Sequence, residues 1–218
     1  MAESRELTLG TVNLNNHRVE RGQRPDLEAV ADAGARVILV QEATWPLSLP
    51  GFDTHQPRRR DGQVCGEAIL TATELLTRRP GAQLVADGHL STPEHPLRDR
   101  FLVWEAVRTP LGWVRVLSVH RLPRDYPDAL RAPTDAALRV RTRLHRRWVA
   151  GGDWNDRLPG ARVVGEHLAG PRIDLWFGSA GVVGAARPGQ VIPFPDRDDG
   201  HPAVLLRLSS AATSAEDD

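Results

Sequence analysis

Short apolar segments recur along the whole chain, and this pattern restricts the fold more than any other feature of the sequence. Eight of them have the length and the β-branched content of strands. They span Leu7–Val12, Val37–Val40, Ala68–Thr71, Phe101–Val107, Val114–Val119, Trp148–Ala150, Ile173–Phe177 and Ala203–Leu208. Many short strands and few helices indicate a protein built on β-sheets.

Two stretches between these segments have helical character. Residues 25–34, PDLEAVADAG, begin with a proline that suits a first helical turn and end with a glycine that suits a helix stop. A second helix is expected over residues 126–147, with Ala137, Val140 and Leu144 on one face. Because proline removes a hydrogen bond from a helix interior, we expect Pro133 to divide it into two pieces.

The connections between strands indicate the fold class. The helix at residues 25–34 joins the first two strands by a crossover, whereas Pro110 and Gly112 in RTPLGW are typical of a tight hairpin. Local hairpins mixed with a crossover favour two packed mixed β-sheets flanked by helices. We therefore predict an α/β protein of the α+β type, not a doubly wound parallel sheet.

The composition sets limits on organisation and location. A chain of 218 residues that is 40% hydrophobic fits one core, so we expect a single domain over residues 1–208. The last ten residues, 209–218, are small, polar and acidic, and we expect a disordered tail. The sequence has neither a signal-like start nor an apolar run long enough for a membrane span, and its single cysteine, Cys65, fits a reducing compartment. These features predict a cytoplasmic protein, which we expect to be a monomer.

The net charge argues against strong nonspecific attraction to polyanions. The chain has 28 basic and 28 acidic residues, so its formal net charge is zero. A protein that binds nucleic acid through its overall field carries a clear basic excess. Any recognition of phosphate must therefore be local.

Acidic, amide and histidine residues stand at the ends of several apolar segments. Asp174 lies inside the apolar strand RIDLWF, where an isolated carboxylate costs free energy unless it is hydrogen-bonded or bound to a metal. It is therefore a candidate functional residue. Hard oxygen ligands, amides and paired His and Asp side chains are the groups that hydrolyse phosphoesters with Mg²⁺. The candidates at strand ends are Glu42, His120, Asp153, Asn155, Asp174, Asp199 and His201.

The order of the motifs around these residues resembles the endonuclease/exonuclease/phosphatase superfamily, whose members share the DNase I-like fold. LTLGTVN resembles its opening strand, VILVQE the strand that ends in a metal-binding Glu, and SVH the strand that ends in a catalytic His. GGDWN, RID and DGHP resemble its Gly-Asp-X-Asn, Arg-Ile/Leu-Asp and terminal Ser-Asp-His elements. The matches span residues 7–208, and they imply a DNase I-like four-layer sandwich.

The resemblance implies a role for each candidate. Glu42 and Asn13 would bind Mg²⁺ or Mn²⁺, and Asp153 would orient or deprotonate the attacking water. Asn155 would hold a phosphate oxygen. His201, with one ring nitrogen bound by Asp174, would act as the oriented acid/base or phosphate-stabilising histidine. His120 would stabilise the charged transition state from the opposite side. Beyond these roles, Arg98 and Arg100, just before a strand, are candidate phosphate-binding residues at the rim.

These features predict a divalent-metal-dependent phosphoester hydrolase, and we expect a nuclease or a related phosphodiesterase, with nucleic acid as a candidate substrate. A phosphatase or phosphodiesterase for a small molecule or a lipid headgroup fits the same motifs. A catalytically inactive binding relative is the third alternative, because Gly200 stands where the superfamily has an acidic residue that supports the metal. Asp199 takes that place if the loop shifts by one residue, which the conformational freedom of Gly200 permits.

This departure leads to a test of the metal site. If Asp199 supports the ion, Asp199→Ala weakens Mg²⁺ binding and slows catalysis, whereas Asp198→Ala leaves both unchanged. The reason is that a second carboxylate contributes only within coordination or one-water reach of the ion. Calorimetric titration of both variants with Mg²⁺ measures the difference, and equal affinities would exclude Asp199 from the site.

Overall fold

The computed structural model describes residues 6–15, 24–59, 61–94, 98–156, 165–171, 173–194 and 201–210. Within these ranges the strands form two mixed sheets of six strands each. The predicted α+β class and the pair of packed sheets are therefore confirmed. None of the helices in the described ranges combines the length and the apolar character needed to cross a membrane.

The first sheet contains the strand, helix, strand unit that the sequence predicted. β1 and β2 are parallel neighbours, and α1 (Arg24–Asp32) connects them with Leu27 and Val30 buried. The other pairs in this sheet are antiparallel. Its strands, from edge to edge, are β11 (Ala186–Ile192), β12 (Ala203–Ser209), β1 (Glu6–Asn13), β2 (Val37–Gln41), β4 (Ala68–Ala72) and β3 (Phe52–His55).

The second sheet repeats this plan with one parallel pair among antiparallel ones. β7 and β8 are parallel, and α2 (Asp128–Arg143) lies between them in sequence. The predicted hairpin is confirmed, since β6 and β7 pair antiparallel down to Thr109 and Gly112. The strands in order are β5 (Thr77–Ala86), β6 (Arg100–Thr109), β7 (Gly112–His120), β8 (Trp148–Asp153), β10 (Asp174–Gly178) and β9 (Glu166–Ala169).

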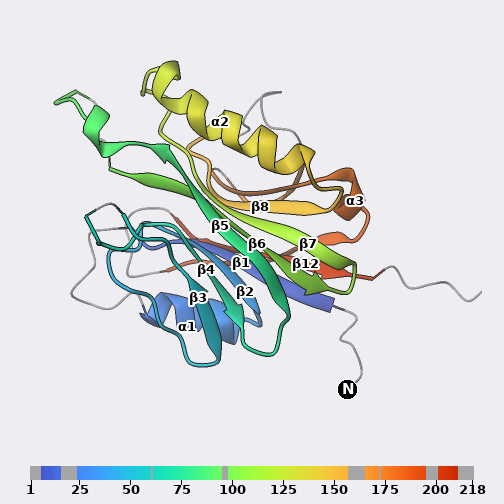
Figure 1. The fold of residues 1–218 in the computed structure, drawn as a ribbon. Helices are drawn as coiled ribbons and strands as arrows, with labels where there is room; N and C mark the ends of the chain where they lie inside the picture. The colour runs from blue at the N-terminus through green and yellow to red at the C-terminus, as the bar shows by residue number, and fades with distance from the viewer. Residues whose placement is uncertain are drawn as a thin grey trace, which may run out of the picture.

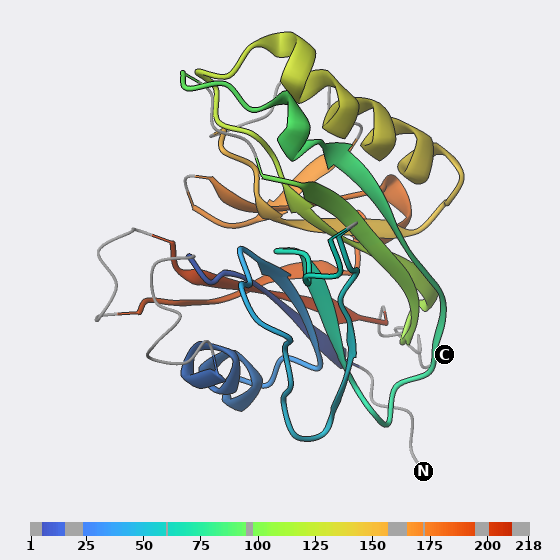
Figure 2. The same cartoon turned by 60° about the vertical axis from the view of Figure 1, so that its left-hand side comes forward.

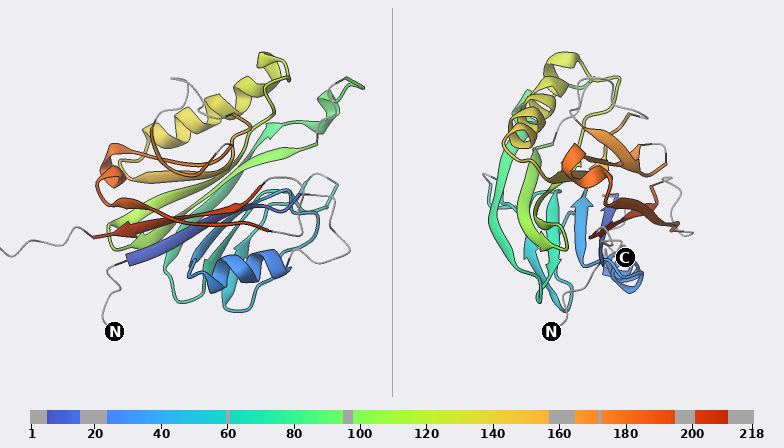
Figure 3. Two further views of the ribbon diagram at one scale, coloured as in Figure 1. Left: turned by 180° about the vertical axis from the view of Figure 1, so that it is seen from behind. Right: turned by 90° about the vertical axis from the view of Figure 1, so that its right-hand side faces the viewer.

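The two sheets pack face to face between two helices, which gives the four layers (Figure 1). Figures 2 and 3 show α1 and α2 on opposite sides of this sandwich. One apolar cluster fills the space between the sheets, a second lies under α1 and a third under α2. Two short helical segments, η2 (Gly88–Leu90) and α3 (Ala180–Val183), lie outside these layers.

All eight predicted strands exist, and the four that were not predicted are β3, β5, β9 and β11. These four are the edge strands of the two sheets. Central strands are buried on both faces and read as continuous apolar segments, whereas an edge strand exposes much of its length to water. β5, for example, begins TRRPG and is exposed over its first four residues.

The predicted break at Pro133 is wrong, because α2 continues through it. Residues on both sides of the proline pack inward, with Leu130 against Leu122 and Leu138 in the cluster under the helix. This packing outweighs the roughly 3 kcal/mol that an interior proline costs. The predicted apolar face is also wrong, since Val140 is exposed and the buried side carries Thr134, Asp135, Ala137, Leu138 and Thr142.

Strand direction and register bring the ends of several strands to one side of the sandwich. His120 ends β7 opposite Asp153 at the end of β8, and Asp174 begins the antiparallel β10 in register with Asp153. In the first sheet, Asn13 ends β1 opposite Gln41 at the end of β2. The polar residues that follow the apolar strands therefore collect at one edge.

A buried carboxylate lies between the sheets. Glu105 on β6 is 5% exposed and accepts a hydrogen bond from the Thr71 hydroxyl on β4. Burial raises the pKa of Glu105 to about 6, with a further contribution from the charge of Asp53 and against the hydrogen bond from Thr71.

This burial makes stability depend on pH in a defined direction. A pKa that is higher in the folded state means that the folded protein binds the proton more tightly, so stability falls as the pH rises from the unfolded value toward and through 6. Glu105→Gln removes this dependence. Between pH 4 and pH 7, the Glu105 side chain should lower the free energy of unfolding of the unaltered protein by about 2 kcal/mol, and this decrease should be absent in the variant. Urea denaturation across this range measures it, and parallel profiles would contradict the prediction.

Candidate active site

Glu42 follows β2 in a left-handed backbone conformation, with φ of 56°. This conformation is uncommon for a residue with a side chain and occurs where the surrounding structure holds it. Here the next residue, Ala43, donates its N–H to the carbonyl of Gly66 at 2.8 Å. The loop after β2 is thereby tied to the residues before β4, which brings Glu42 close to Glu67.

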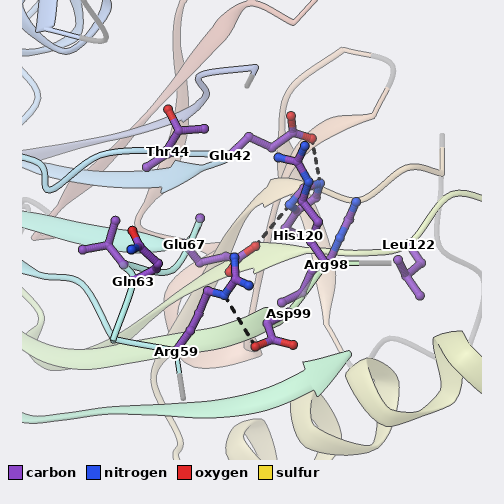
Figure 4. A pocket seen from close by; sticks show the side chains of 13 residues that line it. Glu42, Thr44, Arg59, Gln63, Glu67, Arg98, Asp99, His120 and Leu122 are labelled. Carbon is purple, nitrogen blue, oxygen red and sulfur yellow. Dashed lines mark hydrogen bonds and ion pairs between the residues drawn. The ribbon is translucent and has the colours of Figure 1, made fainter. Parts of the chain in front are cut away.

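His120 lies between these two glutamates (Figure 4). Its Nε2 is 3.2 Å from Glu42 Oε1, and its Nδ1 is 3.2 Å from Glu67 Oε1. Glu67 is almost fully buried, and its second oxygen accepts a hydrogen bond from the Phe101 N–H at 3.0 Å. The histidine is therefore held in orientation from the Nδ1 side by a carboxylate that is itself fixed.

The surroundings of His120 act on its pKa in opposite directions. Burial and the positive charge of Arg100 lower it. The carboxylates of Glu42, Glu67 and Asp153 outweigh these effects, so the net shift of the pKa is upward. The ring lies among more negative than positive charge, which suits a group that carries a proton or faces a cation.

Asp153 ends β8 and is held by groups from both sheets. The side-chain amide of Asn13 donates to Asp153 Oδ2 at 3.1 Å, and the backbone N–H of Asn155 donates to Oδ1 at 2.8 Å. The same Oδ2 atom is 3.8 Å from His120 Nε2. Asp153 is 2% exposed, so these contacts replace the water that a free carboxylate would need.

A glycine just before this aspartate allows β7 and β8 to approach closely. Gly152 has φ of 147°, and a Cβ at this position would lie 1.9 Å from the carbonyl oxygen of Val119. No other residue fits without moving one of the two strands. The second glycine of GGDWN is therefore a steric requirement of the strand pair that carries His120 and Asp153.

Asp174 and His201 form a second carboxylate and histidine pair. His201 Nδ1 is 3.2 Å from Oδ1 and 3.1 Å from Oδ2 of Asp174. The predicted hydrogen bond between these residues is therefore present. Asp174 is 2% exposed, and His201 keeps part of its ring accessible.

Arg121 anchors the loop after His120 to α2. Its guanidinium makes two parallel hydrogen bonds to Asp135, at 2.8 and 2.9 Å, and both side chains are buried. Its backbone N–H donates to the carbonyl of Asp153, and its own carbonyl accepts from the side chains of Asn155 and Arg100. One buried ion pair thus fixes the backbone of Arg121, which makes hydrogen bonds with Asp153, Asn155 and Arg100.

A cavity of about 450 Å³ opens beside His120, and both basic and acidic side chains line it (Figure 4). Arg98, Arg100 and Arg59 line it together with the two glutamates that flank the histidine. Arg98 is exposed, whereas Arg100 is half-buried and burial lowers its pKa. The two arginines predicted at the rim therefore lie at the candidate site.

Two groups of side chains could hold a metal ion, and Asp153 belongs to both. One contains Glu42, His120 and Asp153, and the other contains Asp153, Asp174 and His201. Within each group the ligand atoms lie within 4.8 Å of one another. His120 Nε2 is buried and, among the described residues, has no well-formed hydrogen bond, although it faces Glu42. A divalent cation beside these oxygens fits this arrangement of charge.

The structure brings together almost every residue that the sequence singled out. Asn13, Glu42, His120, Asp153, Asn155, Asp174, His201, Arg98 and Arg100 lie at the same end of the sandwich or line its cavity. Asp199 lies outside the described residues. The roles assigned to these residues remain predictions.

Glu67 was missed by the sequence analysis. It precedes β4 in CGEAIL, so an acidic residue directly before a fully apolar strand was the available signal. Glu42, His120 and Asp153, the residues it joins, stand instead at the carboxyl ends of their strands. β4 runs antiparallel to β2, so the start of β4 lies at the same edge as the end of β2.

No model of a known protein family matches this sequence, and no curated protein does. Solved structures do match over nearly the whole chain. An endonuclease/exonuclease/phosphatase from Bacteroides vulgatus aligns with a TM-score of 0.70, at 13% identity, over 94% of this chain and 99% of its own. The chain has the DNase I-like fold.

Two further structures with the DNase I-like fold carry different descriptions. The endonuclease domain of TRAS1, a telomere-specific non-LTR retrotransposon, aligns with a TM-score of 0.63 and 17% identity over 94% of this chain and 98% of its own. A mannosyl-6-phosphatase of Bacteroides thetaiotaomicron aligns with a TM-score of 0.64 and 17% identity over 92% of this chain and 98% of its own. Identities this low establish the fold alone.

The buried ion pair of Arg121 gives a test of how the site is held within the DNase I-like fold. Asp135→Ala leaves the guanidinium buried with one fewer partner, and we expect the free energy of unfolding to fall by about 3 kcal/mol or more. Asp125→Ala, an exposed change just before α2, is the matched control and should stay within about 0.5 kcal/mol of the unaltered protein. Chemical denaturation measures both. Equal effects would mean that the ion pair does not anchor the loop.

Proposed function

We propose that this protein is a divalent-metal-dependent phosphoester hydrolase in which water attacks phosphorus. The observation that carries the proposal is the position of Asp153 between two histidines, each with its Nδ1 facing a buried carboxylate. Burying a carboxylate costs free energy unless it is paired and hydrogen-bonded, and buried pairs of titratable groups gather at functional sites. Two such pairs around one aspartate supply an acid, a base and a cation site within a few ångströms.

Glu42 and Asn13 would bind the cation on the first sheet, and Asp153 would approach it from the second. A bound Mg²⁺ or Mn²⁺ would withdraw charge from the phosphoryl oxygens and lower the pKa of water. Asp153 would orient the attacking water or take its proton. The hydrogen bonds from Asn13 and Asn155 hold its carboxylate in one rotamer for that task.

The two histidines would act on the phosphate. Glu67 and Asp174 accept from the Nδ1 side, so the other ring nitrogen of each histidine faces away from its carboxylate. A histidine fixed in this way donates a hydrogen bond to a nonbridging oxygen or a proton to the leaving group. Asn155 has a second amide hydrogen besides the one bound to the Arg121 carbonyl, and it would hold another phosphate oxygen.

Water is the nucleophile that fits this site. The cysteine, Cys65, is buried, and burial together with the charge of Glu67 raises its pKa to about 12. It is therefore a thiol at neutral pH and a poor nucleophile. Asp153, by contrast, lies beside both candidate metal groups.

A nucleic acid or another phosphodiester is the substrate class that we favour. Arg98 and Arg100 line the cavity and would contact the phosphates on either side of the one that reacts. Arginine suits this role because one guanidinium can donate two parallel hydrogen bonds to the oxygens of a phosphate. A small phosphoester is the second candidate, and one observation favours it. The cavity beside His120 has the volume of an ordinary small-molecule site.

An assay with Mg²⁺ and with Mn²⁺ against plasmid DNA, single-stranded DNA, RNA and a generic phosphodiester tests this proposal. We expect turnover that a chelator abolishes. Asp153→Ala should lower kcat by at least about a hundredfold, since it removes the group that prepares the water. Asp32→Asn, an exposed change on α1, is the control and should retain full activity. Undiminished turnover in excess chelator would refute metal dependence.

Two further variants separate metal binding from chemistry. Glu42→Gln should raise the metal concentration needed for half-maximal activity, because it replaces a charged ligand by a neutral one. His201→Ala should lower kcat even when the metal is saturating. If His201→Ala changed only the metal requirement, this residue would be a ligand and not a proton donor.

A further inference from the structure

A second cavity, of about 340 Å³, lies at the opposite end of the second sheet from the catalytic groups. It is formed by the start of β5, the end of β6, the start of β7 and the segment between α2 and β8. Its lining is strongly basic and includes Arg78, Arg79, Arg115, His145, Arg146 and Arg147. No carboxylate of the described residues lines it.

Arg115 is the residue that requires explanation. It is 7% exposed, and its Nε atom is buried without a hydrogen-bond partner. Within the described part of the chain it forms no ion pair, in contrast to Arg121, whose buried guanidinium is matched by Asp135. The Nε atom has therefore lost water without gaining a partner among the described residues, and Arg115 lines a cavity that no described carboxylate enters. A negatively charged ligand would supply both the missing hydrogen-bond partner and the counter-charge.

The neighbouring residues raise this cost further. Burial lowers the pKa of Arg115, and the charges of Arg141 and Arg79 lower it again. Burial and the charges of Arg115, Arg79 and Arg141 likewise lower the pKa of His145. The cavity therefore has a high positive potential that an anion would relieve.

The backbone and an aromatic ring help to gather these charges. Arg79 has φ of 53° at a bulge in β5, and bulges commonly redirect side chains. The guanidinium of Arg78 lies 4.0 Å from the ring centre of Trp113, which fixes its position beside the cavity. Arg147 donates a hydrogen bond to the carbonyl of Leu111 in the hairpin. Three arginines from two segments, β5 and the connection between α2 and β8, are thus held around Arg115.

We propose that this cavity binds a phosphate-bearing anion at a site separate from the catalytic one. Several guanidinium groups from different directions, one of them on a largely buried residue, match the tetrahedral array of oxygens and the multiple charge of a phosphate or pyrophosphate group. A monovalent carboxylate would leave most of this charge unmatched.

The site is distinct from the active site in position and in direction. Arg115 precedes His120 by five residues on β7, which corresponds to about 17 Å along a strand. Side chains alternate between the faces of a strand, so Arg115 points to the face covered by α2, as Leu117 does, whereas His120 lies on the face toward the other sheet. The proposal therefore does not depend on the catalytic function.

Titration of the full chain with inorganic pyrophosphate in the presence of a chelator tests this site, because the chelator removes any metal-dependent binding at the active site. Isothermal calorimetry and thermal unfolding at constant ionic strength, with chloride as the reference salt, are the readouts. We expect saturable binding and a rise in Tm. Arg115→Met should weaken pyrophosphate binding by at least about tenfold, the usual effect of losing a hydrogen bond to a charged group.

Arg139→Met removes an exposed arginine of α2 outside the cavity and is the matched control, which should bind like the unaltered protein. Without anion, Arg115→Met should have a Tm equal to or above that of the unaltered protein, because an unmatched buried charge is removed. A lower Tm with unchanged pyrophosphate binding would show a purely structural arginine and overturn the proposal, as would the absence of saturable binding.

A second arm identifies the source of the phosphate. A single-stranded oligonucleotide offers singly charged phosphodiesters, whereas pyrophosphate is a compact polyanion. Binding of pyrophosphate alone, sensitive to Arg115→Met, assigns the cavity to a free phosphate compound. Tighter binding of the oligonucleotide with the same sensitivity assigns it to the backbone of a strand. Oligonucleotide binding that Arg115→Met leaves unchanged, with no pyrophosphate binding, would place the contact elsewhere and exclude this site.

Discussion

Hydrogen bonds that cross the sandwich fix how the two sheets face each other, and the candidate site depends on them. Asn13 on β1 donates to Asp153 on β8, and Gln41 on β2 donates to Ser118 on β7 at 2.9 Å. Apolar packing alone tolerates small shifts between sheets, because dispersion and burial have little directionality. Buried polar groups do not tolerate such shifts, since a shift would leave each of them without its hydrogen-bond partner. The same contacts that align the sheets therefore align the two halves of the site.

The sequence was sufficient for the central strands and insufficient for the edges, and the reason is physical. β2 and β4 are buried along their whole length, so nearly all of their residues are apolar, and Gln41 and Thr71 are hydrogen-bonded. β5 and β11 are largely exposed, so many of their side chains are polar and the strands lack a continuous apolar pattern. Pro133 shows the same limit for a helix. Its local cost is readable from the sequence, but the packing that offsets this cost comes from β-strands far away in the chain.

Site residues were predictable where a single strand carries the information. His120 and Asp153 follow apolar strands directly, and the order of motifs along the chain supports them. Glu67 and Arg121 acquire their importance from partners on other elements, namely His120 for the first and Asp135 of α2 for the second. Neither partnership leaves a mark at short range in the sequence. The positioning residues of a site are therefore harder to predict than the residues that they position.

Gly152 determines how closely β7 and β8 approach each other, and therefore how His120 lies relative to Asp153. Two parallel strands pass so closely at this residue that a single methyl group would collide with the carbonyl of Val119. Substitutions in the core can be compensated by neighbours of complementary size, but a backbone collision has no side chain that can adjust. Any side chain at position 152 would have to push β7 away from β8, and the separation of His120 and Asp153 would change with it. The distance across this part of the candidate site is thus set by contact between two main chains, which no repacking of side chains can restore.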